Sequence, residues 1–473
     1  MDSDPMPLKK PAPKAAQPTM PAKKPPQPIM PPRGMRDILP QDQPFWEMLR
    51  TKCKEVATAY GFERIDTPAV EETALFVRGI GRQTDIVEKE MYSFETTGAE
   101  KLTLRPEGTA PIMRSYISNG MVNLPQPVKL WYEGMFFRHE RPQHGRYRQL
   151  QQFGCEVIGD DDAVTDAQLA LISWIVLKEL GIESTVRINS IGTPESRTNY
   201  KNALVSYFRS KRPKLSEDDK RRLVRNPLRI LDSKDPAVVE MKAEAPQIVD
   251  WLDEESKAHF MRVLEYLDET GVPYQLDPYL VRGLDYYTRT VFEVYANSDD
   301  QELAQSALGG GGRYDGLAEI LGGRPTPAVG FALGLDRIVS RMKDLGVQPV
   351  APPVDVFVAQ LGEQGRKRAL AVFEELRQAG IRAAEAFSKD AIKAQMEIAN
   401  RRAAKWAIVI GQKEVLDGTA ILRDMDSGTQ EITDVRKVVH ELKKKLGMNQ
   451  EERKASGVQH ASTSIGNPPD TTT

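Results

Sequence analysis

The sequence predicts an α+β protein in which a large mixed domain is followed by a smaller α/β domain. Strand-like and helical stretches are mixed over the first three quarters of the chain, with a mostly helical region from about residue 193 to residue 270. After Pro352 and Pro353, strands alternate with helices, which is typical of a small α/β sheet domain. The chain of 473 residues is long enough for two or three domains.

The elements of the large domain follow from the spacing of apolar residues. Such residues recur at helical intervals between Phe45 and Tyr60, and Gly61 ends that helix. The next stretch, FERIDTPAV, predicts a strand whose Pro68 belongs at an edge or interface, because proline has no N–H to donate. The later elements are a strand pair turning at Gly98, a long helix capped by Gly181, the strand STVRINSIG, the helical region, the strand TRTVFEVYA and the helix GLDRIVSRMKDLG.

The small domain is predicted to contain three strands and two helices in alternation, completed by a hairpin and a helix. Gly380 ends the first of its helices. The strands are VDVFVAQL, IRAAEAF and WAIVIG, the helices are QGRKRALAVFEELRQAG and DAIKAQMEIANRRAA, the hairpin turns at residues 426–428, and the last helix is VRKVVHELKKKLG.

Composition narrows the classes of function. The net charge is −2, so nucleic-acid binding would need a local basic patch. One stretch, residues 209–229, has nine lysines or arginines against three acids, and it is either a solvated helical face or a phosphate-contacting patch. The two cysteines form no CxxC pair, which disfavours a disulfide framework and fits a reducing cytosol, so a cytoplasmic protein is predicted. No apolar run reaches the roughly 18 residues of a membrane span.

Several common catalytic motifs are missing. The sequence contains no P-loop, GxGxxG, GxSxG or HExxH motif. His139, His144, Cys155 and Glu156 lie close together in the sequence, but the spacing of the histidines matches no common set of metal ligands. No protein-held metal is therefore predicted.

A long hairpin in the large domain combines a charged loop with a polar strand. The strand-like stretches VKLWYEGMFFR and YRQLQQFGCEVIG flank the loop HERPQHGR. Because side chains alternate along a strand, one face of the second strand carries Arg148, Leu150, Gln152, Gly154, Glu156 and Ile158. Burying its polar members without partners would be costly. The face is therefore either the lining of a polar pocket or an exposed surface with pairs such as Arg148–Glu156.

Arginine beside glycine recurs in three separate stretches. Four arginines lie between Arg138 and Arg148, Arg282 lies in LVRGLDYYTRTVFEVY, and Arg337 lies in TPAVGFALGLDRIVSRM. A guanidinium group keeps its charge and binds phosphate in a planar, bidentate way, and glycine lets a ligand approach the backbone closely. These stretches predict a site for a polyanion.

These motifs resemble those of class II aminoacyl-tRNA synthetases. FRHERPQHGRYRQ and GFALGLDR are similar to motifs 2 and 3 of that family, and GFERIDTPAVE is similar to motif 1. RGMRDILP, LTLRPEGTAP, LVRGLDYYTRTVFE and GGRYDGL resemble the histidyl-tRNA synthetase members in particular. The resemblance covers about residues 33–447. It implies an antiparallel sheet flanked by helices, an inserted helical domain, a C-terminal α/β anticodon-binding domain and a homodimer joined partly through motif 1.

The resemblance and the composition together set the expected organisation. The first 32 residues hold eleven prolines, five lysines and no arginine, which disfavours a mitochondrial transit peptide and predicts a disordered tail, with a proline-rich docking segment as the alternative. The expected parts are this tail (1–32), a catalytic domain (33–345) with a helical insertion (about 193–270), a linker (346–353), an anticodon-binding domain (354–447) and a second disordered tail (448–473).

The implied reaction explains the arginines. Histidine activation joins an already ionised carboxylate to the α-phosphate of ATP, so what needs stabilising is negative charge on the phosphorus and on the leaving pyrophosphate. By resemblance, Arg138 binds the α-phosphate and positions the carboxylate, and Arg282 is the catalytic arginine near the α-phosphate. Mg²⁺ would accompany the nucleotide. The resemblance implies that ATP is bound by Arg138, Glu140, Arg146, Leu150 and Arg337.

Histidine selection needs a donor and an acceptor for the imidazole and an anion for the ammonium group. The resemblance implies that Tyr286 and Tyr287 flank the imidazole, and that glycines 309–312 form either a floor below the substrate or a flexible turn. It implies a contact of Arg141 and Gln143 with the tRNA acceptor end. The implied histidine-binding residues are Glu107, Gly108, Thr109, Arg138, Gln152, Glu156, Arg282, Tyr286 and Tyr287.

One position departs from the family pattern. The family usually has phenylalanine where this chain has Leu150, and that ring stacks on adenine. Leucine keeps the apolar contact and loses the ring face, so weaker ATP binding is expected. The main hypothesis is a ligase that charges histidine onto tRNA-His. The alternatives are a catalytically inactive synthetase-like regulator and a non-enzymatic RNA-binding protein.

Overall fold

The computed structural model describes residues 28–140, 145–233, 235–298, 306–349 and 354–448. The chain divides into two compact units, with the boundary between Pro349 and Val350. Arg141 and Gln143, residues 350–353 of the expected linker, and residues 1–27 and 449–473 of the expected tails lie outside the described residues. No helix among the described residues combines the length and the apolar character that crossing a membrane requires.

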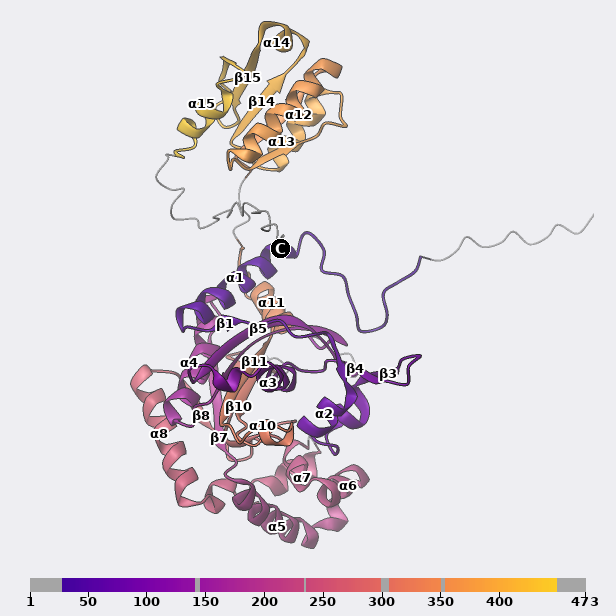
Figure 1. Ribbon diagram of the computed structural model, residues 1–473, viewed down its shortest axis with the longest axis vertical. Coiled ribbons are helices and arrows are strands. Elements are labelled where there is room, and N and C mark those ends of the chain that lie inside the picture. Colours follow the sequence, from indigo (N-terminus) through magenta and orange to yellow (C-terminus); the bar gives the residue numbers. More distant parts are fainter. Residues whose placement is uncertain (1–27, 141–144, 234, 299–305, 350–353, 449–473) are drawn as a thin grey trace, which may run out of the picture. The chain divides into compact units, whose positions relative to one another are not determined.

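The first unit is built on an antiparallel sheet with eight strands among the described residues (Figure 1). The neighbours β5 to β7 in this sheet all pair in antiparallel, and only the two edge strands, β1 and β8, pair in parallel with their neighbours. The predicted α+β class with an antiparallel sheet is confirmed. The strands, in sheet order, are β1 (Glu63–Arg64), β5 (Val128–Phe137), β6 (Gln149–Ile158), β11 (Ala328–Gly334), β10 (Ala307–Arg313), β9 (Thr288–Ala296), β7 (Ser184–Ser190) and β8 (Tyr274–Leu276).

Helices cover one face of this sheet with an apolar core. Alternate residues of β6, namely Phe153, Cys155 and Val157, point into that core, and each is fully buried. The intervening residues of β6 point to the opposite face, where the polar side chains lie. The covering helices are α1 (Gln43–Ala59), α4 (Ala163–Glu179), α8 (Glu254–Thr270) and α11 (Leu335–Asp344).

The opposite face is only partly covered, which leaves room for a site. The helices α3 (Thr109–Ser118) and α10 (Leu317–Ile320) pack there against β5 and the end of β6. The helix α2 (Thr73–Gly79) and the segment Ile86–Glu90 form a small separate core beside α3.

The region between β7 and β8 is helical, as its spacing predicts. Asp, Ser or Thr side chains cap its main helices by accepting a backbone N–H, as Thr193 does from Ser196. Figure 1 shows α5, α6 and α7 grouped at one end of the first unit. Before α8 this region contains α5 (Pro194–Ser210), Arg212–Lys214, α6 (Glu217–Arg225), Pro227–Asp232, α7 (Pro236–Lys242) and Ile248–Trp251.

Two expectations about strands need correction. FERIDTPAV was predicted as one strand, but the chain there forms β1 and then β2 (Val70–Glu72), which belong to different sheets. Pro68 lies between them, where its missing N–H costs no ladder bond. The alternative of a flexible turn at glycines 309–312 is wrong, because these residues lie in the central strand β10. The strand pair turning at Gly98 is confirmed: β3 (Tyr92–Glu95) and β4 (Lys101–Leu104) pair in antiparallel, and β4 also pairs with β2.

The second unit is an α/β domain with its own core. Its first three strands pair in parallel and its last two form an antiparallel hairpin, as the alternating pattern predicts. The strands, in sheet order, are β13 (Ala383–Glu385), β12 (Val356–Gln360), β14 (Trp406–Ile410), β15 (Thr419–Asp424) and β16 (Gln430–Asp434). The helices are α12 (Gly362–Gln378), α13 (Ile392–Arg401), α14 (Gln412–Asp417) and α15 (Val438–Lys445).

Candidate active site

A cavity of about 290 Å³ opens on the polar face of the main sheet. Its lining comes from the β5–β6 hairpin, the start of α3, the segment before β9, and the strands β9, β10 and β11 with the start of α11. Among the predicted site residues, the cavity brings together Glu107, Gly108, Thr109, Arg138, Glu140, Arg146, Leu150, Gln152, Arg282, Tyr286, Tyr287 and Arg337. Glu156 is absent from the lining and is buried next to it.

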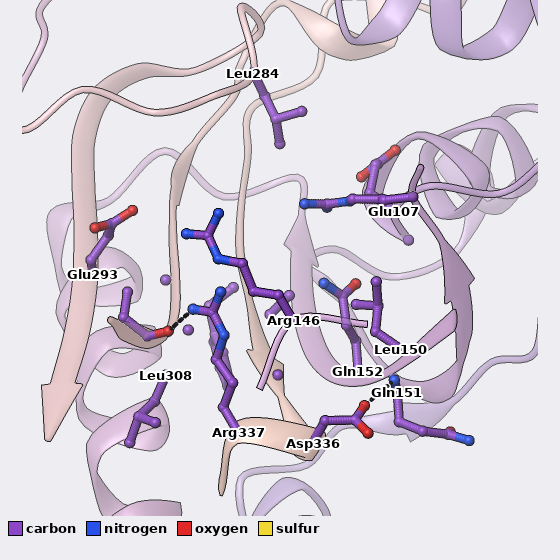
Figure 2. Close-up of a pocket in the computed structure, with 18 of the residues that line it drawn as sticks. Glu107, Arg146, Leu150, Gln151, Gln152, Leu284, Glu293, Leu308, Asp336 and Arg337 are labelled. Carbon is purple, nitrogen blue, oxygen red and sulfur yellow. Dashed lines mark hydrogen bonds between the residues drawn. The ribbon is translucent and has the colours of Figure 1, made fainter. Parts of the chain in front are cut away.

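Arginines from distant parts of the chain converge in this cavity. Arg138 follows β5 directly and donates from Nε to the carbonyl oxygen of Pro106 at 2.8 Å. Arg337 lies in the first turn of α11 and donates to the carbonyl oxygen of Ala307 in β10. Figure 2 shows Arg146 and Arg337 reaching together into the cavity. These backbone contacts fix the positions of the guanidinium groups without neutralising their charge.

Glu140 lies between two of these arginines. Its carboxylate is 3.8 Å from Arg138 Nη1 and 3.5 Å from Arg146 Nη1. One carboxylate therefore faces two cations. Burial and the nearby Arg146 also lower the pKa of Arg337. This part of the cavity carries excess positive charge, which a polyanion would neutralise.

Arg282 is held by a carboxylate that the sequence reasoning did not identify. Its Nη1 forms an ion pair with Glu293 of β9, and the Tyr295 hydroxyl donates to the other carboxylate oxygen. Burial would lower the pKa of Arg282, but the Glu293 carboxylate more than offsets this effect, so the pKa is raised. Arg282 Nε is buried without a hydrogen-bond partner among the described residues. The guanidinium is thus permanently charged, with donor capacity left for a ligand.

Glu107 occupies the N-terminal end of α3. One of its carboxylate oxygens accepts the Thr109 N–H at 2.8 Å and the other accepts the Ala110 N–H at 3.0 Å. Burial raises the pKa of Glu107, and the two backbone donors partly offset this rise. The Tyr286 hydroxyl lies 3.5 Å from the same carboxylate. A buried acid at a helix N-terminus is a fixed partner for a cationic group.

Glu156 is buried beside the cavity. Thr109 Oγ1 donates to one of its oxygens at 2.8 Å, and the Tyr314 hydroxyl donates to the other. Burial raises the pKa of Glu156 to about 8, although both hydroxyl donors lower it. The alternative of a solvent-exposed face with an Arg148–Glu156 pair is wrong, because Glu156 is 1% exposed and its partners are Thr109 and Tyr314.

Two buried oxygens near Glu156 have no partner among the described residues. These are Gln152 Oε1 and the Tyr132 hydroxyl, and both residues line the cavity. The Tyr132 ring fits between two glycines: a Cβ on Gly108 or on Gly154 would approach Tyr132 Cζ at 2.5 Å. Unsatisfied buried polar atoms are costly, so their presence in a cavity indicates that a polar ligand completes them.

Aromatic rings form one wall of this inner part. The ring centroids of Tyr286 and Tyr287 are 4.7 Å apart, and those of Tyr286 and Tyr314 are 5.5 Å apart. The floor includes Gly309, where an added Cβ would approach the carbonyl oxygen of Ala332 at 2.5 Å. Side chains are thus excluded from β10 at this point, and the cavity keeps its depth.

The basic stretch 209–229 lies in the helical region, away from the lining of this cavity. Several of its cations pair with acids on their own helix, as Lys220 does with Glu217 and Arg221 does with Asp218. That pattern on α6 is typical of a solvated helical face. Arg229, which follows α6, instead lines a smaller second cavity. Within the described residues, no group of three or more His, Cys, Asp or Glu side chains is arranged to hold a metal.

Comparison with known proteins identifies the family. A family model described as histidyl-tRNA synthetase matches residues 34–338. The chain belongs to the histidyl-tRNA synthetase family. A second model, described as an anticodon binding domain, matches residues 355–445.

Individual relatives span almost the whole chain. A histidine–tRNA ligase from Dehalococcoides mccartyi (strain 195) is 45% identical over 417 residues, which cover 88% of this chain and 99% of that protein. The solved apo histidyl-tRNA synthetase of S. aureus is 37% identical, with a TM-score of 0.74, and the match covers 88% of this chain and 100% of that one. The histidyl-tRNA synthetase from Nostoc sp. PCC 7120 shares the fold, at 24% identity and a TM-score of 0.61, with 89% of this chain and 100% of that one covered.

Proposed function

We propose that this protein is a histidine–tRNA ligase. It activates L-histidine with ATP to give histidyl-adenylate and pyrophosphate, and then transfers histidine to the 3′ end of tRNA-His. The observation that carries the proposal is a single cavity in which arginines from three distant segments face a buried pocket of acids and tyrosines. Membership of the histidyl-tRNA synthetase family supports the same conclusion.

The arginines perform the first step by electrostatic stabilisation. The histidine carboxylate is ionised at neutral pH, so its attack on the α-phosphate needs no general base. Arg138 and Arg282 bind the α-phosphate and hold the carboxylate near it, and they stabilise charge that builds on the phosphorus. Arg337 and Arg146 bind the outer phosphates, which leave as pyrophosphate. The pairing of Arg282 with Glu293 supports this role because it holds the guanidinium in place before substrate binds.

Magnesium accompanies ATP in this proposal. Mg²⁺ keeps several waters and is usually bound by substrate phosphates with one or two carboxylates. The cavity fits that mode, because Glu140 and Glu293 line it but both already face arginines, so the phosphates and waters would supply most ligands of the ion. When bound, the ion supplies further positive charge to the phosphates. Leu150 contacts the adenine with its apolar surface, and Glu140 lies beside that base.

The inner part of the cavity selects histidine. The Glu107 carboxylate, with Thr109 beside it, takes the ammonium group of the amino acid. Gln152 and Glu156 supply the polar contacts of the imidazole, and Tyr286 and Tyr287 flank the ring. This assignment is supported by the unpartnered Gln152 Oε1 and by the burial of Glu156. An imidazole carries one donor and one acceptor, so it matches a pocket that offers both.

The remaining parts of the chain serve the tRNA. Arg141 and Gln143 contact the acceptor end, and the second unit binds the anticodon region. The second unit's match to an anticodon-binding family model supports this division of labour. The protein works as a cytoplasmic homodimer in which motif 1, with Pro68, lies at the interface.

A catalytically inactive synthetase-like regulator and a non-enzymatic RNA-binding protein are the alternatives. A regulator would not need Arg138, Arg282 and Arg337 together at a nucleotide site. An RNA-binding protein would not need a buried imidazole pocket beside those arginines. The combination favours the ligase.

The test is pyrophosphate exchange into ATP with the purified full-length chain. Exchange is expected to depend on histidine and on Mg²⁺, and to be absent when another proteinogenic amino acid replaces histidine. Exchange without histidine, or none under any condition in a folded protein, would contradict the proposal.

A further inference from the structure

A second cavity lies next to the active-site cavity, on the side of the helical region. It has a volume of about 140 Å³. Its lining comes from α5, the Pro227–Asp232 turn and the segment before β9. Arg282 and Leu284 line both cavities. The volume of the second cavity is about half that of the active-site cavity.

The lining of the second cavity is strongly cationic. Arg197, Lys201, Arg229 and Arg282 line it, and Asp285 is the acid among its lining residues. Among the bonds of these arginines, Arg197 Nη1 donates to Tyr287 O at 2.6 Å, and Arg229 Nη2 donates to Gly283 O at 3.0 Å. These bonds orient the two guanidinium groups.

Lys201 is the most telling of the four cations. Its ammonium makes no hydrogen bond and no ion pair with any described residue, although the side chain is half-buried. Burial and the charge of Arg197 both lower the pKa of Lys201, and the charge of Asp285 raises it by less. An ammonium group with three unused donors beside a second cation is unfavourable unless an anion joins them.

Asp285 only partly offsets the charge of this cluster, because the pKa values of Arg197 and Lys201 both remain lowered despite its effect. Its carboxylate accepts a hydrogen bond from Asn226 Nδ2 at 3.2 Å and is exposed to solvent. Asn226 Oδ1 is buried without a partner among the described residues, so the polar lining is incomplete on this side as well. A protonated phosphate oxygen or a bridging water would complete it.

We propose that the second cavity, whose lining includes Arg229 and Arg282, binds a phosphoryl anion held by Lys201 and Arg197. The chemistry is that of inorganic phosphate, of pyrophosphate or of a phosphate group in an RNA chain. The proposed function releases pyrophosphate in the neighbouring cavity. The inference that pyrophosphate is the natural occupant therefore rests on that proposed function. Because Arg282 lines both cavities, an anion here lies beside a residue that also lines the substrate cavity.

The test is a calorimetric titration of the full-length protein with pyrophosphate, without ATP, at constant ionic strength. Arg337→Gln serves as the background, because it weakens binding in the active-site cavity and leaves the second cavity intact. In this background about one pyrophosphate is expected to bind per chain. Adding Lys201→Gln should weaken that binding about tenfold or more, since one charged donor to an anion is worth at least this factor.

Two controls keep the result interpretable. Lys257→Gln, on the exposed face of α8, should leave the titration unchanged, because Lys257 pairs only with the exposed Glu254 among the described residues. Thermal unfolding in chloride should show Lys201→Gln to be at least as stable as the wild type, because the substitution removes a repulsive cation. Histidine-dependent exchange, measured separately, tests the proposed function and is not needed for the titration.

A parallel binding experiment with tRNA-His distinguishes a free phosphate or pyrophosphate anion from a phosphate group of an RNA chain. If Lys201→Gln leaves pyrophosphate binding unchanged but weakens tRNA-His binding about tenfold, the site takes an RNA phosphate. If neither pyrophosphate nor tRNA-His binding responds to Lys201→Gln, the proposal is overturned. A crystal of the wild type soaked in pyrophosphate should show the ion beside Lys201, and its absence there at saturation would also count against a free anion.

Discussion

At the scale of single residues, the Arg282 guanidinium carries the strongest catalytic assignment. Its pairing with Glu293 fixes it in the cavity, and its Nε remains available to a ligand. Arg282→Ala should therefore lower histidine-dependent pyrophosphate exchange by about a hundredfold or more, since it removes a preorganised charge from the transition state. Circular dichroism should show an unchanged fold.

The matched control for that substitution is Arg221→Ala on α6. Arg221 is an exposed arginine that pairs with Asp218 on the same helix. Exchange should stay within about twofold of the wild type, because this pair lies outside the cavity and an exposed ion pair contributes little to stability. Full exchange activity in Arg282→Ala would remove Arg282 from the mechanism.

Glu156 provides a prediction about pH. Its pKa of about 8 in the folded protein lies above the ordinary value of 4.5, so folding favours the protonated form. The group therefore costs no stability below about pH 4.5, and it destabilises the fold increasingly as the pH rises towards 8. Between about pH 6 and about pH 9, the wild type should lose roughly 1–3 kcal/mol of unfolding free energy relative to Glu156→Gln.

Urea unfolding at the two pH values measures this difference, because every other titrating group is common to both proteins. Glutamine is the isosteric neutral analogue of the protonated acid. A constant difference between the two proteins would mean that Glu156 ionises normally in the folded state.

Some site residues could be predicted from the sequence and others could not. The alternation of side chains along β6 was enough to place Gln152 and Glu156 on one face. In the structure Gln152 lines the cavity and Glu156 is buried beside it. Glu293 was missed because its partnership with Arg282 depends on how the turn between them folds. Tyr132 had a usable signal, since a large aromatic residue lies directly opposite Gly154 in the hairpin register.

At the scale of elements, β6 and its neighbours give the cavity its shape. Gly154 of β6 leaves space for the Tyr132 ring, and an added Cβ would approach Phe331 O at 2.6 Å as well as that ring. Gly154→Ala should destabilise the protein by about 1–3 kcal/mol, because neither a backbone oxygen nor a buried ring can move freely. Thermal or urea unfolding measures the change.

Gly98→Ala is the appropriate comparison for Gly154→Ala. In the β3–β4 turn, the nearest atom to an added Cβ on Gly98 is Thr96 Oγ1 at 3.7 Å, which is an ordinary contact. The unfolding free energy should change by less than about 0.5 kcal/mol. Equal effects of the two substitutions would show that the crowding around Gly154 does not determine stability.

Helices and strands with a regular spacing of apolar residues were predictable, and short elements were not. The β5–β6 hairpin, α4 and the strands of the second unit follow from alternation or helical spacing. The stretch FERIDTPAV has the composition of one strand, but Pro68 separates it into two short strands that pair with different partners. The helix α3 was missed because Pro111 lies in its first turn, where proline is tolerated but hides the helical pattern.

At the scale of the whole molecule, the two units have separate cores and separate family matches. The first contains the cavity, and the second contains an apolar core on each face of its own sheet. This division fits a protein that activates an amino acid in one unit and recognises RNA with the other. The division into a mixed domain and an α/β domain was predictable, because strand-like and helical stretches begin to alternate regularly after residue 353 of the sequence.

The measurement that tests the central claim most directly is the charging of tRNA-His by the full-length protein. With ATP, Mg²⁺ and labelled histidine, label should become covalently attached to tRNA-His, and it should not attach when tRNA of another specificity or another amino acid is supplied. Formation of the charged tRNA requires the arginine cluster, the imidazole pocket and RNA recognition together. A folded protein that binds histidine and tRNA-His yet leaves the tRNA uncharged would contradict the account and favour a regulatory role.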